Sequence, residues 1–257
     1  SIKRRWYTCR KEKAMRNYEI KTDLHTHTLA STHAYSTLEE NCRGAFANGL
    51  EGINMSDHGP SMPDAPYEGH FSNMRILPEY IHGIKVWKGA EANIVDYEGR
   101  IDLTEHTLGR LECIVASFHE HTFKAGTVEQ HTNAYMQALK NPKIHILGHS
   151  GTAQYPYDHD TVIKEAARLG KAIELNEATF HVRPSSIANC RKIIAKCKKY
   201  GAFISVDSDA HFSAFVGVYD CARKLLDELD FPQELIINRN AETVSKWLKE
   251  LAAASEN

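Results

Sequence analysis

Histidines near the start of the chain have a spacing that suits metal binding. His25 and His27 are separated by one residue and end a short apolar run, and His33 lies six residues beyond His27. In a β-strand, residues i and i+2 point to the same face, so His25 and His27 can direct both imidazoles into one pocket. Neutral imidazole is the commonest metal-binding side chain in proteins. For this pair alone, two unrelated surface or core histidines are the alternative.

Later segments of the chain repeat this pattern, in which an apolar run ends in a side chain that can bind a metal ion. These side chains are His58, Glu91, His119, His149, Asp209 and His211. A histidine that only packs in a core has no reason to follow a strand rather than lie within it. In α/β barrels the functional site forms at the carboxyl ends of the strands. The sequence therefore predicts that these residues share one site.

The elements that must position these residues alternate between strands and helices. Apolar runs predict strands at about 20–24, 52–55, 84–89, 112–117, 144–147, 172–176 and 202–206. Helical spacing of apolar residues predicts helices at about 38–48, 127–139, 160–168, 186–200 and 218–229, with a last strand and helix at 235–237 and 241–251. This alternation predicts a parallel sheet with helices outside it, and seven strands in one domain favour a barrel over an open, doubly wound sheet.

Two parts of the chain fit this alternation less simply. The connection from 59 to about 74 is rich in glycine, proline and polar residues, and loops of this length are usually functional or mobile. A short helix at about 76–81 is expected after it.

Residues 1–18 form a basic extension that lacks the apolar region of a signal peptide. We expect it to lie outside the barrel, with a docking arm for an acidic partner as the alternative.

Length and composition restrict the class of protein. The chain has 257 residues, enough for one α/β barrel or two ordinary domains, and its 42% hydrophobic and 25% charged residues are typical of soluble globular proteins. A net charge of -2 argues against general binding to nucleic acid or membrane surfaces. No apolar run is long enough for a transmembrane helix. The six cysteines form no CxxC pair and are expected to be reduced, in a cytoplasmic protein.

Six motifs taken together resemble the PHP (polymerase and histidinol phosphatase) family. They are Asp-Leu-His-Thr-His-Thr, Ser-Asp-His-Gly, Gly-Ala-Glu-Ala-Asn-Ile, Ala-Ser-Phe-His, Leu-Gly-His-Ser-Gly and Asp-Ser-Asp-Ala-His. They occur in the family's order over about residues 18–250, and they most resemble its branch of stand-alone, YcdX-like trinuclear zinc phosphatases. The resemblance implies a single α/β domain at 19–257 with a distorted (β/α)7 barrel, which is TIM-barrel-like and agrees with the seven predicted strands.

The resemblance also implies nine ligands for three metal ions per chain. His25, His27 and Asp209 would hold the first ion, Glu91 would bridge it to a second ion held by His119 and His149, and His33, His58 and His211 would hold the third. Imidazole and carboxylate ligands suit Zn²⁺, with Mn²⁺ or iron as alternatives. Nine ligands shared by three ions leave positions open for water and substrate, as in catalytic sites.

Such a site suits the hydrolysis of phosphate esters. Metal ions about 3.5–4 Å apart can activate a bridging hydroxide and neutralise phosphoryl oxygens, so we expect a hydrolase that acts on a small phosphomonoester. Asp209 and Glu91 are the expected catalytic ligands, and Asp57 and Asp207 are candidates for orienting neighbouring histidines. Arg183, after the sixth strand, is expected to bind the phosphate. An exposed arginine paired with a surface carboxylate is the alternative for Arg183.

Other functions are compatible with the same motifs. They are a 3′-to-5′ exonuclease or phosphodiesterase, a histidinol phosphatase, and a non-catalytic metal-binding regulator. The exonuclease is disfavoured because no basic stripe follows the N-terminal extension, and the regulator because all nine ligands are present. A small phosphorylated substrate is therefore the expected partner, nucleic acid and membranes are not expected, and a homo-oligomer is left open.

Overall fold

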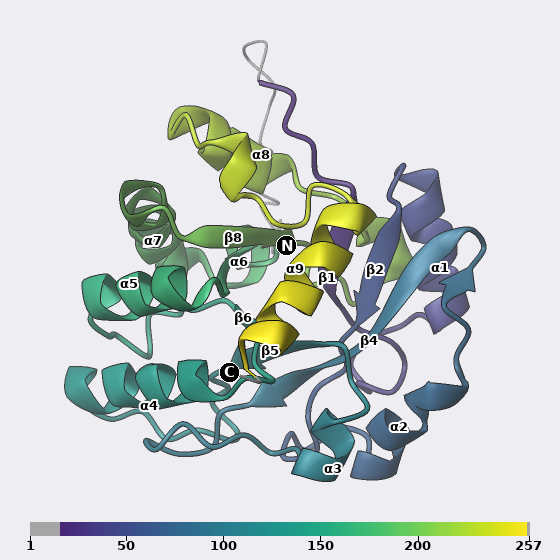
Figure 1. Cartoon of the computed structure of the whole chain (residues 1–257), viewed down its shortest axis with the longest axis horizontal. Coiled ribbons are helices and arrows are strands. Elements are labelled where there is room, and N and C mark those ends of the chain that lie inside the picture. Colours follow the sequence, from purple (N-terminus) through teal and green to yellow (C-terminus); the bar gives the residue numbers. More distant parts are fainter. Residues whose placement is uncertain (1–15, 256–257) are drawn as a thin grey trace, which may run out of the picture.

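The computed structural model describes residues 16–255 and shows a parallel sheet at its centre (Figure 1). Within this range, seven strands follow one another across the sheet in sequence order: β1 (Thr22–Thr26), β2 (Gly52–Met55), β4 (Ile84–Asn93), β5 (Cys113–Ser117), β6 (Ile146–Leu147), β7 (Ala172–Asn176) and β8 (Phe203–Asp207). A further short strand, β3 (Tyr80–Ile81), pairs antiparallel to β4. Nearly all strand residues are buried, as expected for a parallel sheet that is covered on both faces.

The first and last strands of this series come together and nearly close the sheet into a barrel. A parallel bridge joins Thr26, at the end of β1, to Ala210, just beyond β8. At the other end, the Asn238 side chain lies between the two strands and donates to the carbonyls of Thr22 (2.8 Å) and Val206 (2.7 Å). A side-chain amide thus satisfies backbone groups that a neighbouring strand would otherwise bond. The predicted barrel of seven parallel strands is confirmed.

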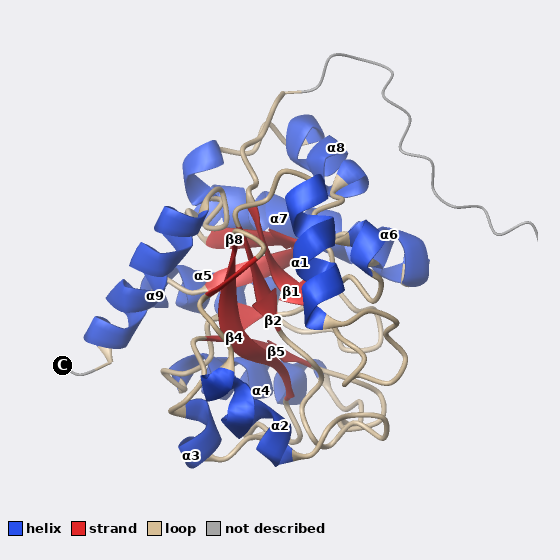
Figure 2. Ribbon diagram, turned by 90° about the vertical axis from the view of Figure 1, so that its right-hand side faces the viewer, coloured by secondary structure: helices blue, strands red, loops and turns tan. Residues whose placement is uncertain are grey.

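Helices alternate with the strands and surround the barrel (Figures 1 and 2). The longer ones are α1 (Leu38–Ala47), α4 (Val128–Lys140), α5 (His159–Leu169), α7 (Ile187–Tyr200) and α8 (Asp220–Glu228). Local sequence determines where they begin and end. Thr37 and Glu40 form a capping box at the start of α1, and Gly170 and Gly201 end α5 and α7 in the left-handed conformation.

Helix α9 (Ala241–Ala254) closes the end of the barrel at which the strands begin. Its residues Val244, Trp247 and Leu251 form one buried apolar cluster with barrel side chains that include Leu24 and Trp87. Helix α9 and the short helix α6 (Thr179–Val182), which follows β7, lie on opposite sides of the strands (Figure 2). The carboxyl ends of the strands are therefore left for the loops and the predicted site residues.

Some local expectations are wrong. Residues 76–81 are not a helix, because the helical turns come earlier, in α2 (Glu68–Ser72) and a 3-10 turn at Asn73–Ile76, and Tyr80–Ile81 pairs with β4 instead. A short helix, α3 (Glu105–Leu108), was not predicted. Residues 235–237 form only one bridge, from Ile204 to Ile236, because a 3-10 turn at Gln233–Leu235 precedes them. All cysteines were expected to be reduced, but Cys221 is disulfide-bonded. Among the described residues, Cys42, Cys113, Cys190 and Cys197 are free and buried, as expected.

The predicted basic extension lies mostly outside the described residues. In its described part, Arg16 pairs with Asp230 (3.2 Å). Tyr18 is buried, and its hydroxyl lies within hydrogen-bond distance of the carbonyls of Leu226 (2.9 Å) and Phe231 (3.1 Å). The last residue of the extension is thus packed against the core. Among residues 16–255, no helix is both long enough and apolar enough to cross a membrane.

His145, just before β6, links the stability of the fold to pH. Its ring is buried, and Nδ1 accepts the backbone N–H of Ile114 (3.0 Å). Burial, reinforced by the charges of Lys171 and Lys143, lowers the pKa of His145 from 6.5 to about 3. Below pH 6.5 the unfolded chain therefore binds a proton that the folded chain does not. Stability is lost as the pH falls from about 6.5 toward 3.

We expect His145 alone to lower the free energy of unfolding by about 2 kcal/mol between pH 7 and pH 5. Urea unfolding of chelator-treated protein at both pH values measures this loss. In His145→Asn, the amide oxygen can still accept the Ile114 N–H, but nothing at this position titrates. The loss should therefore shrink by about the same amount in the variant. An identical pH dependence in the two proteins would contradict the assignment.

Candidate metal centre

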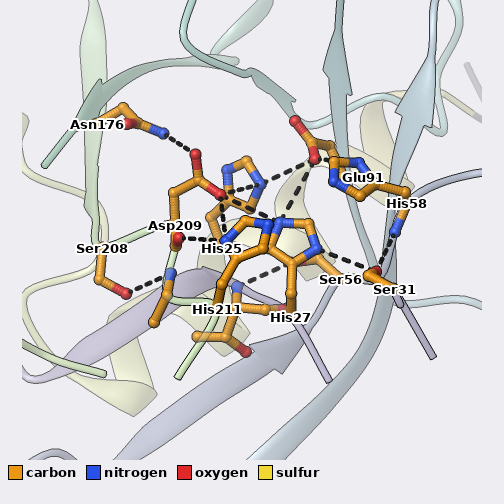
Figure 3. Close-up of polar contacts among 12 residues, drawn as sticks. His25, His27, Ser31, Ser56, His58, Glu91, Asn176, Ser208, Asp209 and His211 are labelled. Atoms are coloured by element: carbon orange, nitrogen blue, oxygen red, sulfur yellow. Dashed lines mark hydrogen bonds and ion pairs between the residues drawn. The ribbon is translucent and has the colours of Figure 1, made fainter. Parts of the chain in front are cut away.

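The predicted ligands lie together at the carboxyl ends of the strands, around Glu91 of β4. Figure 3 shows part of this cluster, with His25, His27, His58, Glu91, Asp209 and His211 labelled. Its carboxylate is buried and faces five imidazoles. The distances from its oxygens are 2.9 Å to His58 Nδ1 and His149 Nε2, 3.2 Å to His25 Nε2 and His119 Nε2, and 3.5 Å to His27 Nε2. These residues come from or directly follow β1, β2, β4, β5 and β6, so the barrel itself brings them together.

Asp209 faces two of the same histidines from the other side (Figure 3). Its Oδ1 lies 3.1 Å from His27 Nε2 and 3.5 Å from His25 Nε2, while its Oδ2 lies 3.1 Å from a guanidinium nitrogen of Arg183. The backbone of Asp209 has φ 55°, and that of His149 has φ 25°. Such left-handed conformations cost about 1–3 kcal/mol outside glycine and gather at functional sites.

His33 and His211 extend the cluster toward solvent. Their Nε2 atoms are 2.8 Å apart, and the ring of His211 stacks on that of His27 with centroids 4.2 Å apart. The side chains of His33 and His211 are 47% and 28% exposed, against 0–12% for the other seven predicted ligands. The structure therefore brings all nine residues into one cluster, with a buried inner part and an exposed outer part.

Hydrogen bonds at the far side of two rings fix which nitrogen carries the proton. His25 Nδ1 lies 2.6 Å from the carboxylate of Glu174 and must donate to it. His119 Nδ1 lies 2.7 Å from the amide oxygen of Asn93, whose nitrogen donates elsewhere, so it too is a donor. The Nε2 atoms of both rings therefore direct lone pairs at Glu91.

The same reasoning applies to His27 through a hydroxyl group. Ser31 donates to Asp57 (2.8 Å), so its oxygen is left to accept from His27 Nδ1 (3.3 Å). His27 Nε2 then directs a lone pair at the carboxylates. Asp57 thus helps to orient a predicted ligand. Asp207, by contrast, accepts the backbone N–H of Leu24 (2.8 Å) and joins the first and last strands.

The two exposed histidines repeat this arrangement. His33 Nδ1 donates to Asp64, and His211 Nδ1 donates to the backbone carbonyl of Asp209 (2.9 Å). Their facing Nε2 atoms therefore both carry lone pairs. Two lone pairs at this distance repel each other unless a positive charge lies near them.

Several of these facing atoms are buried and make no hydrogen bond in the described part of the chain. They are His25 Nε2, His27 Nε2, His58 Nδ1 and Glu91 Oε2. An unsatisfied buried polar atom costs about 1–3 kcal/mol, so four in one cluster need a common partner. Ligand atoms in three overlapping groups lie within 4.8 Å of one another: His25, His27 and Glu91; His58, Glu91 and His119; and His27, His58 and His211. These nitrogen and oxygen donors fit metal ions such as Zn²⁺.

The charges in the cluster favour the metal-binding forms of Glu91 and His119 but the protonated form of His25. Burial raises the pKa of Glu91, but His25, His119 and His58 outweigh it and hold that pKa well below its usual value. Burial lowers the pKa of His119 to about 4, so its ring is neutral at pH 7. For His25, burial is outweighed by Glu174 and the other carboxylates, which raise its pKa. A proton and a metal ion therefore compete for His25.

Of the residues that orient the predicted ligands, Asp57 was predicted from the sequence, but Glu174, Asn93 and Asp64 were not. Glu174 of β7 accepts from His25 and, through its other oxygen, from the backbone N–H of His149 (2.6 Å). Asn93 and Asp64 each fix one further ring. None of the three is a side chain that ends an apolar run, which was the pattern used to predict the ligands. The one signal for Glu174 was an acidic residue inside an otherwise apolar strand.

Comparisons with known proteins identify relatives over most of the chain. The family model of the PHP domain matches residues 23–229. A protein of Acetivibrio thermocellus named probable phosphatase is 44% identical over 227 residues, which cover 88% of this chain and 94% of the relative. A probable phosphatase of Caldicellulosiruptor saccharolyticus is 45% identical over 230 residues, which cover 90% of this chain and 96% of the relative.

Solved structures with a similar fold are more distant in sequence. One is histidinol phosphate phosphatase from Lactococcus lactis, in complex with zinc, L-histidinol and phosphate, with a TM-score of 0.56, 16% identity, and coverage of 82% of this chain and 94% of that chain. Another is a putative histidinol phosphatase from Listeria monocytogenes, with a TM-score of 0.58, 17% identity, and coverage of 79% and 99%. At this identity the likeness establishes the fold only.

Proposed function

Because this chain belongs to the PHP domain family, we propose that it is a metal-dependent phosphatase that hydrolyses a small phosphomonoester at a site for three metal ions. The observation that carries this proposal is the convergence of buried imidazole nitrogens, which have no hydrogen-bond partner among the described residues, on the carboxylates of Glu91 and Asp209. Two relatives that align with most of the chain are named probable phosphatases, and one protein of similar fold was crystallised with zinc and phosphate. Zinc is therefore the first metal to test, before manganese or iron.

The positions of the side chains suggest how three ions would share them. The proposed sets are His25, His27, Glu91 and Asp209 for the first ion; Glu91, His119 and His149 for the second; and His33, His58 and His211 for the third. Glu91 Oε2 faces the two histidines of the first set, and Oε1 faces both histidines of the second. A carboxylate placed in this way is suited to bridge two ions.

The chain's own residues would bind and orient a phosphate group beside these ligands. Divalent metal ions bound there would lower the pKa of coordinated water and neutralise phosphoryl oxygens. Arg183 is held at the edge of the site by Asp209 (3.1 Å) and Asn176 (3.4 Å), and its side chain remains 25% exposed. Its guanidinium can therefore pair with a phosphate that enters from solvent. Asp209 would fix that guanidinium next to the first set of ligands.

Substrate assays with and without chelator test the proposed function. The purified protein is given p-nitrophenyl phosphate, bis-p-nitrophenyl phosphate and labelled single-stranded DNA. We expect turnover of the monoester, loss of that turnover after chelation, and its return with zinc. Release of nucleotides from the DNA without monoester turnover would instead indicate the nuclease. No turnover of any substrate by metal-loaded protein would contradict an enzymatic role.

Arg183→Ala should lower kcat/KM for the monoester by about 10- to 100-fold, because a charge-assisted hydrogen bond to a phosphate is worth about 1.5–3 kcal/mol. Arg183→Lys keeps the charge but not the planar fork, so its loss should be smaller. Arg191→Ala is the control, since Arg191 pairs with Glu228 on the outer helices. Unchanged kinetics in Arg183→Ala would leave Arg183 as a structural partner of Asp209 only.

A further inference from the structure

The nine predicted ligands differ in how their positions are secured. Five of the six residues of the first two sets are buried, and the side chain of the sixth, His119, is only 12% exposed. Their orienting partners Glu174 and Asn93 lie in strands, and Ser31 is buried in the loop after β1. In the third set, His58 is also buried, but His33 lies on the irregular connection between β1 and α1 and its side chain is 47% exposed. The least secured ligand therefore belongs to the third set.

A second loop holds His33 in place. Asp64, on the connection between β2 and α2, accepts a hydrogen bond from His33 Nδ1–H through its carboxylate. Its backbone carbonyl accepts the N–H of the neighbouring Thr32 (3.1 Å). The same residue thus fixes both the backbone beside His33 and the orientation of its ring. The two more exposed rings differ in what orients them. The ring of His211 donates to a backbone carbonyl, whereas the ring of His33 depends on the side chain of Asp64.

We propose that Asp64 is the positioning residue for the third metal ion, and that this ion is bound more weakly than the other two and exchanges separately from them. This inference rests on the proposed three-ion site. Without the Asp64 carboxylate, the His33 ring is free to rotate, and its Nε2 lone pair no longer stays opposite His211 Nε2. The first two sets share no hydrogen bond with Asp64, so they should keep their ions. Partners of this kind typically change metal affinity by about 10- to 100-fold.

Native mass spectrometry of zinc-loaded protein tests the inference by counting ions per chain during a titration with chelator. In the wild-type chain we expect one ion to leave first and two to remain. In Asp64→Ala, the first ion should leave at a chelator concentration about 10- to 100-fold lower, with the other two unchanged. In Asp64→Asn, the first ion should leave at a chelator concentration between those for the wild type and Asp64→Ala, because the amide oxygen can still accept from His33 Nδ1. His33→Ala should resemble Asp64→Ala or exceed it.

Asp96→Ala is the matched control, because Asp96 is also a loop aspartate but pairs with Arg100. Two results would overturn the inference and leave the three-ion site intact. One is that the three ions leave together in the wild-type chain, and the other is that the first ion leaves Asp64→Ala at the same chelator concentration as the wild type. Fewer than three ions in the fully loaded wild-type chain would overturn the proposed site and this inference with it. If Asp64→Ala does not fold, by circular dichroism, the comparison of Asp64→Asn with the wild type decides.

Discussion

Replacing Glu91 with glutamine should abolish the proposed bridging of the first two metal ions and lower phosphatase activity by about 10²- to 10⁴-fold. Removing one partner of a buried charge cluster costs about 3–5 kcal/mol, which corresponds to a rate change of that order. The substitution keeps the size of the side chain, but it replaces one carboxylate oxygen with an N–H donor. Five imidazole nitrogens face this carboxylate within 3.5 Å, so the substitution alters five contacts at once.

Two measurements on Glu91→Gln separate a lost metal site from a lost fold. Elemental analysis should find fewer bound ions, while circular dichroism should find the same helix and strand content as in the wild type. Glu79→Gln is the control, because Glu79 pairs with Lys85 near the beginning of β4, at the other end of the barrel. Full activity in Glu91→Gln, with three ions still bound, would contradict the central role of this residue.

Glu174→Gln should weaken binding of the first two metal ions by about 10- to 100-fold, although Glu174 is not itself a proposed ligand. Its two oxygens accept from His25 Nδ1 (2.6 Å) and from the backbone N–H of His149 (2.6 Å). Glutamine has one acceptor oxygen, so it can satisfy only one of these donors and must turn an N–H toward the other. The strained backbone of His149, at φ 25°, then loses a bond that holds it.

Zinc affinity of Glu174→Gln, measured by competition with a chelator, checks this expectation. Glu177→Gln is the matched control, because Glu177 is also buried and accepts the backbone N–H groups of Cys221 and Ala222, on α8. We expect the control to lose stability but to keep its metal affinity. Equal zinc affinities in Glu174→Gln and the wild type would show that Glu174 only supports the strand.

Much of the fold and of the site could be predicted because the information is local. Each strand is a short apolar run, and each predicted ligand ends such a run or stands in a short motif beside it. His33 is the exception, since its loop carries no pattern, and its place depended on the resemblance to a family. The parallel order of the strands then follows from their alternation with helices. This local information was enough to bring Glu91 and its five histidines to one end of the barrel.

Asp57 was a candidate because it adjoins His58, but the other partners that orient the ligands could not be predicted, because they come from other parts of the chain. Glu174 lies 149 residues from His25, and Asn238, which completes the closure of the barrel, lies 216 residues from Thr22. Nothing in the neighbouring sequence indicates such pairs. The helical turns at 68–76 were misplaced for a related reason. Pairing with β4 draws Tyr80–Ile81 into the sheet, and this tertiary contact overrides the local pattern.

The number of metal ions per chain tests the central claim most directly. Native mass spectrometry of the zinc-loaded, desalted protein should find three ions per chain, and His25→Ala combined with His27→Ala should reduce that number. Fewer than three ions in the wild-type chain would contradict the account, because part of the cluster of facing lone pairs would then need a different explanation.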